Sequence, residues 1–138
     1  MQGVPLVPGV AGGLLVLAKE PLSFWGGYDP ASGEVIDRRH PLSGVSIAGK
    51  VLAVPASRGS STTTAVLVEA LQAGTAPLAL ITRQPDSFFA LAAIVADELF
   101  GRSIPVVQLA PELFDRLPAG AWVEIALDGT LAFKELAA

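Results

Sequence analysis

Apolar residues fall into short runs along the chain, and stretches rich in glycine, proline and hydroxyl side chains separate these runs. A short apolar run bounded by turn-forming residues is typical of a buried strand, whereas apolar residues that recur every third or fourth position are typical of a helix. The runs that predict strands are residues 14–18, 34–37, 49–55, 77–82 and 104–109. The stretches that predict helices are residues 63–73, 87–100 and 111–117.

Residues suited to helix ends stand at the borders of the two longer predicted helices. Gly74 and Gly101 follow their last apolar positions, and glycine ends many helices because it adopts the left-handed backbone conformation without strain. Ser87 stands where the second of these helices begins. A serine hydroxyl there accepts a hydrogen bond from a free backbone N–H group, so we expect Ser87 to be the N-cap.

The C-terminal part of the chain carries a turn motif. Asp128-Gly129 separates the apolar runs 121–127 and 130–135, and an Asp-Gly pair in this position predicts a β-hairpin. Strands and helices alternate in the middle of the chain. The whole order predicts an α/β fold with a mixed sheet, flanking helices and a C-terminal hairpin, in a single domain that spans residues 1–138.

Composition and charge narrow the classes of partner. Only 16% of the residues are charged and 51% are apolar, whereas roughly a quarter of residues are usually charged. Some apolar surface is therefore expected to lie under a partner, the alternative being a compact alanine-rich domain. The net charge is −4 and the only adjacent basic pair is Arg38-Arg39, so no basic stripe for nucleic acid is present.

Two further absences limit the chemistry. No apolar run approaches the roughly 20 residues that cross a bilayer, so we expect a cytoplasmic protein that binds no membrane. The chain has no cysteine and one histidine, which excludes cysteine-ligated zinc and iron–sulfur sites built from this chain. We expect no metal site here. His40 stands beside Pro41, and we expect it at the surface.

Hydroxyl side chains and glycine cluster where the predicted strand 49–55 gives way to the predicted helix 63–73. The stretch reads Pro55-Ala-Ser-Arg-Gly-Ser-Ser-Thr-Thr-Thr64. The free N–H groups and dipole of a helix start favour an anion. Ser60 and Ser61 are candidates for a reactive hydroxyl, because Arg58 and the helix start would stabilise an alkoxide. The alternative is a hydroxyl-rich helix start beside a solvated arginine.

Two other groups of residues are candidates for binding. Phe24-Trp25-Gly26-Gly27-Tyr28 concentrates aromatic residues around two glycines, which is typical of packing in a core or an interface. Its functional interpretation is a loop that closes a pocket or docks on a partner. Arg83 follows the predicted strand 77–82, and parallel strands often present ligand-binding groups at that end.

Several motifs, in their order and spacing, resemble the small "swivel" subunit of aconitase X, in the aconitase superfamily. They are Ser23-Phe-Trp-Gly-Gly-Tyr-Asp-Pro30, Gly33-Glu-Val-Ile-Asp37, His40-Pro-Leu42, Gly49-Lys-Val-Leu52 and residues 55–64. The resemblance implies a swivelling β/β/α domain that closes over the active site of a large aconitase X-type catalytic subunit. It also implies an iron–sulfur cluster held by the cysteines of that partner, in agreement with the lack of cysteine here.

The resemblance further implies a hydro-lyase, which removes water from a small hydroxylated carboxylate. In the family pattern Ser60 matches the proton-abstracting base, and Arg58 and Ser61 match neighbours that hold the substrate or stabilise the alkoxide. Gly59 and Thr62 complete the expected substrate-binding loop. We expect Trp25, Gly26, Gly27 and Arg83 at a substrate or partner contact. The chain departs from the pattern at Ala56-Ser57 and at the bulkier Thr62-Thr63-Thr64, which puts the fine shape of the pocket and the substrate in question.

The resemblance leaves the substrate open between two types. One is cis-3-hydroxy-L-proline, which we favour because the low lysine and high alanine content is not typical of a hyperthermophile. The other is 5-phosphomevalonate, whose phosphate would need a further cation such as Arg83 or Arg38. A non-catalytic module that binds a small anion is a third interpretation. A swivelling phosphotransfer domain would need a histidine at a helix start, and the Ser60 region has none.

Overall fold

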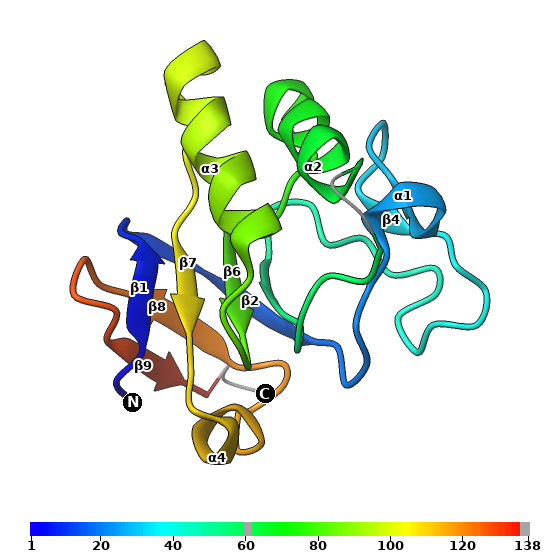
Figure 1. Cartoon of the computed structure of the whole chain (residues 1–138). Coiled ribbons are helices and arrows are strands. Elements are labelled where there is room, and N and C mark those ends of the chain that lie inside the picture. Colours follow the sequence, from blue (N-terminus) through cyan, green and yellow to red (C-terminus); the bar gives the residue numbers. More distant parts are fainter. Residues whose placement is uncertain (60–61, 136–138) are drawn as a thin grey trace.

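A seven-stranded mixed sheet organises the protein (Figure 1). The structure is a computed structural model, and it describes residues 1–59 and 62–135. In sheet order the strands are β1 (Val4–Val7), β7 (Val106–Gln108), β6 (Ala79–Thr82), β5 (Val51–Ala53), β2 (Ala11–Leu17), β8 (Trp122–Ile125) and β9 (Leu131–Lys134). Strands β7, β6, β5 and β2 pair in parallel, whereas β1, β8 and β9 are antiparallel to their neighbours. The short strands β3 (Tyr28–Asp29) and β4 (Glu34–Val35) form a separate pair.

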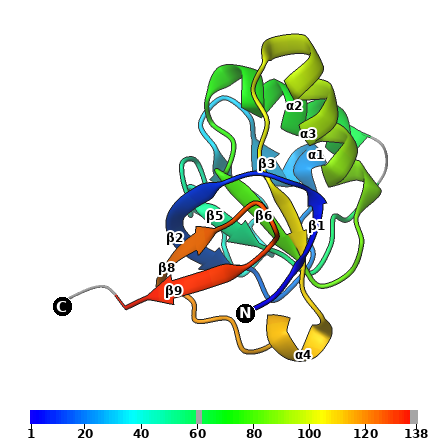
Figure 2. The ribbon, with the colours of Figure 1, turned by 90° about the vertical axis from the view of Figure 1, so that its left-hand side faces the viewer.

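The sheet curls until its two edge strands meet (Figure 2). The Gly3 N–H donates to the Gly129 carbonyl at 3.0 Å, and the Leu131 N–H donates to the Met1 carbonyl at 2.8 Å. Gly129 has a φ of 87°, and a Cβ atom on it would lie 2.6 Å from the Gly3 carbonyl oxygen. Glycine is therefore required at this β1–β9 seam for both conformation and space.

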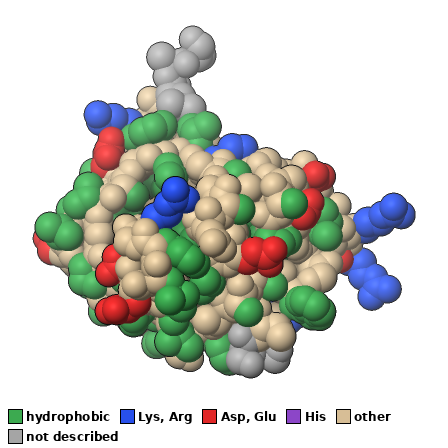
Figure 3. Space-filling view, turned by 90° about the horizontal axis from the view of Figure 1, so that it is seen from above, with side chains coloured by type: hydrophobic (Ala, Val, Ile, Leu, Met, Phe, Trp, Pro, Cys, Tyr) green, Lys and Arg blue, Asp and Glu red, His purple; other side chains and the backbone are tan. Residues whose placement is uncertain are grey.

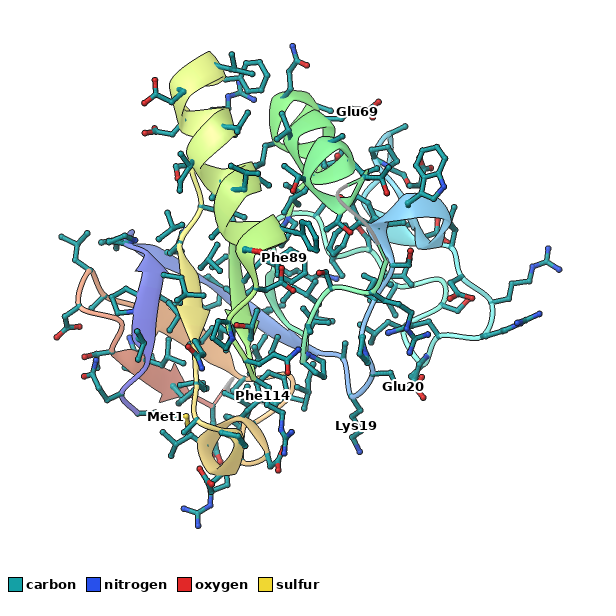
Figure 4. All side chains as sticks on the ribbon, in the orientation of Figure 1. Met1, Lys19, Glu20, Glu69, Phe89 and Phe114 are labelled. Carbon is teal, nitrogen blue, oxygen red and sulfur yellow. The ribbon has the colours of Figure 1, made fainter. Side chains whose placement is uncertain are left out.

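Helices cover one face of the sheet, and the inside of the curl forms a second core. Helices α2 (Thr62–Ala73) and α3 (Ser87–Phe100) pack side by side on the outer face, with the short kinked helix α1 (Phe24–Gly27) beside α2. Phe89 of α3 and Phe114 of α4 (Pro111–Phe114) belong to the two different cores (Figure 4). Successive residues of β6 alternate between these cores, so Leu80 faces the helices and Ile81 faces the inside of the curl.

The structure confirms the predicted α/β class, the two long helices and the C-terminal hairpin. The N-cap prediction is wrong, because Asp86 caps α3 and its carboxylate accepts from the Phe88 and Phe89 N–H groups at 3.1 Å each. Strand β1 was not among the predicted strands. It contains Pro5, and an edge strand tolerates proline because one side of it needs no hydrogen bond. The aromatic segment 24–28, which the sequence analysis interpreted as a loop, holds α1 and the first residue of β3.

The surface mixes apolar and charged side chains. Seen from above, hydrophobic side chains are spread over the molecule, with acidic and basic ones scattered among them (Figure 3). The large apolar side chains that are well exposed include Trp25, Leu91, Ile94 and Leu99. Within residues 1–59 and 62–135, no helix combines the length and apolarity needed to cross a membrane.

Candidate functional site

The polar loop after β5 is tied by its backbone to two neighbouring segments. The Val54 N–H donates to the Ile81 carbonyl at 2.9 Å, which extends the sheet by one residue. Beyond that point the chain turns toward the segment that follows β2. Ser57 forms a parallel bridge with Leu22, and the Arg58 N–H donates to the Leu22 carbonyl at 3.1 Å. The loop therefore leaves the carboxyl end of the parallel strands in a fixed direction.

Gly59 turns the chain toward α2. Its φ is 110°, a conformation that favours glycine, and a Cβ atom there would lie 3.8 Å from the Ser23 Oγ. This position places the loop beside the start of α1. The next two residues, Ser60 and Ser61, lie outside the described residues, and α2 begins at Thr62. The structure therefore describes the residues on both sides of Ser60 and Ser61 but not these two predicted site residues.

Arg58 supplies a positive charge at this place. Its side chain is exposed and makes no hydrogen bond or ion pair with another residue in the described ranges. Thr62 is also exposed and opens a helix of 12 residues. The N-terminus of such a helix carries a partial positive charge of about half an elementary unit. The surroundings therefore favour a carboxylate, or an alkoxide, between Arg58 and α2.

Asp86 is a part of the site that the sequence analysis missed. Its carboxylate is buried, with 6% exposure, and lies where the segment after β6 turns into α3. The Ser57 N–H and hydroxyl donate to Asp86 Oδ2 at 2.7 and 2.8 Å. A hollow of about 200 Å³ opens here, lined by Ala56, Ser57 and residues 84–88. The position of Asp86 directly before a predicted helix could have identified it as an N-cap. The sequence gives no signal for its contact with Ser57.

The aromatic segment has one exposed ring between two buried ones. Phe24 is fully buried, and its ring centroid lies 5.0 Å from Tyr28 and 5.5 Å from Phe89. Trp25 is 69% exposed. The Ser23 hydroxyl donates to the Trp25 carbonyl at 2.8 Å, which ties the Trp25 backbone beside Gly59. Phe24 and Tyr28 therefore anchor the segment, and Trp25 is left at the surface.

Two glycines and a buried tyrosine complete this segment. Gly26 has a φ of 81° and open space where a Cβ atom would stand, whereas Gly27 is buried and its carbonyl accepts from the Ile36 N–H at 3.0 Å. The Tyr28 hydroxyl donates to the Thr75 carbonyl at 2.8 Å. Burial raises the pKa of Tyr28 to about 12. Tyr28 thus stays protonated over the physiological range and acts as a hydrogen-bond donor.

Arg83 belongs to a different hollow. The backbone N–H of Arg83 donates to the Pro55 carbonyl at 3.2 Å. Its guanidinium instead pairs with Asp115, with Nε 3.3 Å from Oδ1 and Nη2 3.4 Å from Oδ2. This second hollow has a volume of about 410 Å³. Its other lining residues are Leu17, Lys19, Pro21, Pro55 and Phe114. Its residues differ from those that line the Ser57 hollow, so the structure does not bring the Arg83 side chain together with Ser57.

The expectation of a surface role for His40 is wrong. The side chain is 6% exposed, and the Leu42 N–H donates to Nδ1 at 3.0 Å. Nε2, which must then carry the proton, lies 3.2 Å from the Glu20 carbonyl and donates to it. His40 thereby joins its own loop to the segment after β2. Local sequence does not reveal this contact, because Glu20 is 20 residues away.

The residues of this chain do not fit an iron–sulfur cluster. The sequence contains no cysteine, and within the described ranges no three or more histidine, aspartate or glutamate side chains converge on one point. Thiolates are the usual ligands of such a cluster. Any cluster in an assembly that contains this chain is therefore held by another part of the assembly.

Comparison with known proteins gives a consistent result. A family model described as "Aconitase X swivel domain" matches residues 1–133. The chain is 54% identical over 91% of its length to the cis-3-hydroxy-L-proline dehydratase of Pseudomonas aeruginosa, of which it spans only 21%. It is 39% identical to the phosphomevalonate dehydratase small subunit of Methanothermobacter thermautotrophicus, over 84% of this chain and 85% of that protein. The crystal structure of Thermococcus kodakaraensis aconitase X in its holo-form matches with a TM-score of 0.86 and 32% identity, covering 97% of both chains.

Proposed function

The chain belongs to the family of aconitase X swivel domains, and on this premise we propose that it is the small, mobile part of a dehydratase. Its partner in this proposal is a large aconitase X-type catalytic part, which carries the iron–sulfur cluster. The swivel part closes over a substrate that the large part holds. We call residues 57–64 the Ser60 loop. Closure brings this loop to the substrate and excludes water.

The observation that carries this proposal is the chemistry of the described residues on either side of Ser60 and Ser61 in the chain. An exposed guanidinium without a partner among the described residues stands on one side, and the start of a 12-residue helix stands on the other. Both stabilise negative charge on a hydroxyl oxygen placed between them. Both also bind a substrate carboxylate. We therefore assign Ser60 as the base, with Arg58, Gly59, Ser61 and Thr62 as the substrate-binding loop.

The proton transfer in this proposal balances without an outside reagent. The Ser60 alkoxide removes a proton from the carbon next to the hydroxylated carbon, and the electrons of that C–H bond form a C=C bond. The C–O bond breaks at the neighbouring carbon, and the hydroxyl leaves with its electron pair. The proton that Ser60 took up is released again, so that the hydroxide and one proton make water and Ser60 returns to its alkoxide form. In this proposal, this chain supplies the base and the charges that stabilise it. The large part assists the departure of the hydroxyl group.

The substrate we propose is cis-3-hydroxy-L-proline or a closely related hydroxy acid. The 54% identity to the Pseudomonas dehydratase, against 39% to the Methanothermobacter small subunit, supports this choice. The pairing of Arg83 with Asp115 also supports it, because a phosphate would have to compete with that carboxylate for the guanidinium. 5-Phosphomevalonate is the second candidate, on the strength of the similarity to the small subunit.

The decisive experiment is an assay of the reconstituted assembly with each substrate. We expect Ser60→Ala to lower kcat by about 100- to 10,000-fold, the usual contribution of a positioned base, with little change in affinity for the large part. Ser103→Ala, which alters a serine at the far end of α3, is the matched control and should keep wild-type activity. Equal activity of Ser60→Ala and wild type would remove Ser60 from the mechanism. A higher kcat/KM for 5-phosphomevalonate would reverse the substrate assignment.

A further inference from the structure

One short segment of the protein holds the Ser60 loop at both ends. On the N-terminal side, Ser57 donates twice to Asp86 Oδ2, at 2.7 and 2.8 Å. On the C-terminal side, the Thr64 hydroxyl donates to the Phe88 carbonyl at 3.0 Å. Asp86 and Phe88 are the N-cap and the second residue of α3. The first turn of α3 therefore contacts the chain three residues before Ser60 and four residues after it.

Asp86 is firmly fixed in this arrangement. The carboxylate is 6% exposed and accepts four hydrogen bonds, two from Ser57 and one each from the Phe88 and Phe89 N–H groups. Hydrogen bonds to a carboxylate are shorter and stronger than those between neutral groups. Phe89 in the same turn is fully buried and packs edge-on against Phe24. The core thus fixes the turn, and the turn fixes the loop.

We propose that Asp86 is a positioning residue for the dehydration reaction. It sets the direction in which the chain leaves Ser57, and so it sets where the Ser60 hydroxyl meets the substrate. Each of its two oxygens already accepts two hydrogen bonds from the protein. This inference rests on the proposed role of Ser60. It goes beyond that role because it assigns the geometry of the loop to a residue 29 positions from Ser57 on another element.

Substitutions at Asp86 separate loop positioning from simple helix capping. Asparagine keeps the size of the side chain but replaces one acceptor oxygen with a donor, so it cannot satisfy both the helix start and Ser57. Serine is a good N-cap and preserves the helix start, but it is too short to reach Ser57 as well. We therefore expect Asp86→Ser to keep α3 capped and folded, with a loss of thermal stability limited to the two lost Ser57 hydrogen bonds, while the loop contact is lost.

The kinetic test uses the assembly with the large part. We expect both Asp86→Asn and Asp86→Ser to lower kcat by about 10- to 100-fold, because a shift of the base by about 1 Å is enough for such a loss. KM and affinity for the large part should change by less than about twofold. Asp128→Asn is the matched control, since Asp128 is exposed and accepts from the Thr130 N–H in the distant β8–β9 hairpin. Wild-type kcat in Asp86→Ser would overturn the proposal and leave Asp86 a cap only.

Amide spectra of the isotopically labelled 138-residue chain provide the independent readout. The amides of residues 57–59 and 62–64 should shift and exchange faster in both Asp86 variants, while those of β8 and β9 should not. Unchanged loop amides would overturn the proposal. If the amides shift but kcat does not fall, Ser60→Ala decides: an inactive Ser60→Ala refutes the Asp86 proposal alone, and an active one refutes the proposed function and this inference with it.

The two contacts of the first turn of α3 with Ser57 and Thr64 form a two-ended clamp on the Ser60 loop. Thr64→Val tests this clamp without changing Asp86. Valine has nearly the shape of threonine but cannot donate to the Phe88 carbonyl. We expect a smaller fall in kcat than in the Asp86 variants, again with little change in KM. This variant also serves if Asp86→Asn fails to fold. A kcat equal to that of wild type would show that the C-terminal anchor does not position the loop and would overturn the two-ended clamp.

Discussion

The β1–β9 seam and the Ser60 loop both join segments that are distant in sequence, but different forces hold them. At the seam, backbone groups bond directly to one another, as in the Gly3 to Gly129 and Leu131 to Met1 hydrogen bonds. At the loop, the backbone bond from Arg58 to the Leu22 carbonyl is joined by side-chain bonds from Ser57 and Thr64 to the first turn of α3. The seam therefore depends on backbone shape and on small residues, whereas the loop depends in addition on the chemistry of a few side chains.

This difference separates stability from function. The two cores that flank the sheet are built from apolar residues contributed by most strands, and burial of such residues dominates the free energy of folding. The loop contributes little buried apolar area, since Arg58, Gly59 and Thr62 are all exposed. A change in the sheet should therefore act on stability first, and a change in the loop should act first on the proposed activity.

The largest effect on stability is expected from a cavity in the sheet. Leu80 is fully buried in the interior strand β6, and Leu80→Ala should lower the free energy of unfolding by about 2–5 kcal/mol. Leu127→Ala is the control, because Leu127 is 63% exposed and its removal should change that free energy by less than about 0.5 kcal/mol. Denaturant unfolding of the chain measures both. Similar midpoints for the two variants would contradict this description of the core.

A second prediction isolates the close contact at the seam. Gly129 and Gly120 have similar φ values, 87° and 83°, but only Gly129 is crowded. Gly120→Ala should therefore cost about 1–2 kcal/mol of stability for the left-handed conformation alone. Gly129→Ala should cost more, because its Cβ atom meets the Gly3 carbonyl. Equal losses of unfolding free energy in the two variants would mean that the seam accommodates the added Cβ atom without strain.

A third prediction concerns pH and the anchor of the aromatic segment. Tyr28 has a folded pKa of about 12 against an ordinary value of 10.0, so its burial favours the protonated form. The stability that this group contributes is full below pH 10 and is lost as the pH rises toward 12. Tyr28 is the only tyrosine in the chain, so the tyrosinate absorbance reports it directly. A titration midpoint near 10 in the folded chain would show that Tyr28 is not held in the core.

The smallest effect on stability is expected at Trp25. Its side chain is 69% exposed, so Trp25→Ala should change the free energy of unfolding by less than about 0.5 kcal/mol. Because it lies beside the Ser60 loop, we expect the same substitution to weaken binding to the large part by at least about 1 kcal/mol, as for an aromatic residue at an interface. Titration calorimetry with Leu127→Ala as the control measures this. Unchanged affinity would place Trp25 outside the interface.

The amino-acid sequence by itself determined the local elements and the place of the candidate site. The apolar spacing of residues 63–73 and 87–100 and the Asp128-Gly129 turn are local properties, and the structure confirms the helices and the hairpin. The Gly- and Ser-rich stretch after β5 can also be recognised as a candidate site from the local sequence, because a strand, a polar turn and a helix start follow one another within a few residues.

Only the tertiary structure decided which residues support that site. Asp86 reaches Ser57 because β5 and β6 are paired in parallel, which brings the ends of both strands to one edge of the sheet. His40 is buried against Glu20 and Arg83 is turned toward Asp115 for the same kind of reason. Such contacts join residues 20 to 32 positions apart, and their formation depends on how the elements pack rather than on any local pattern of residues.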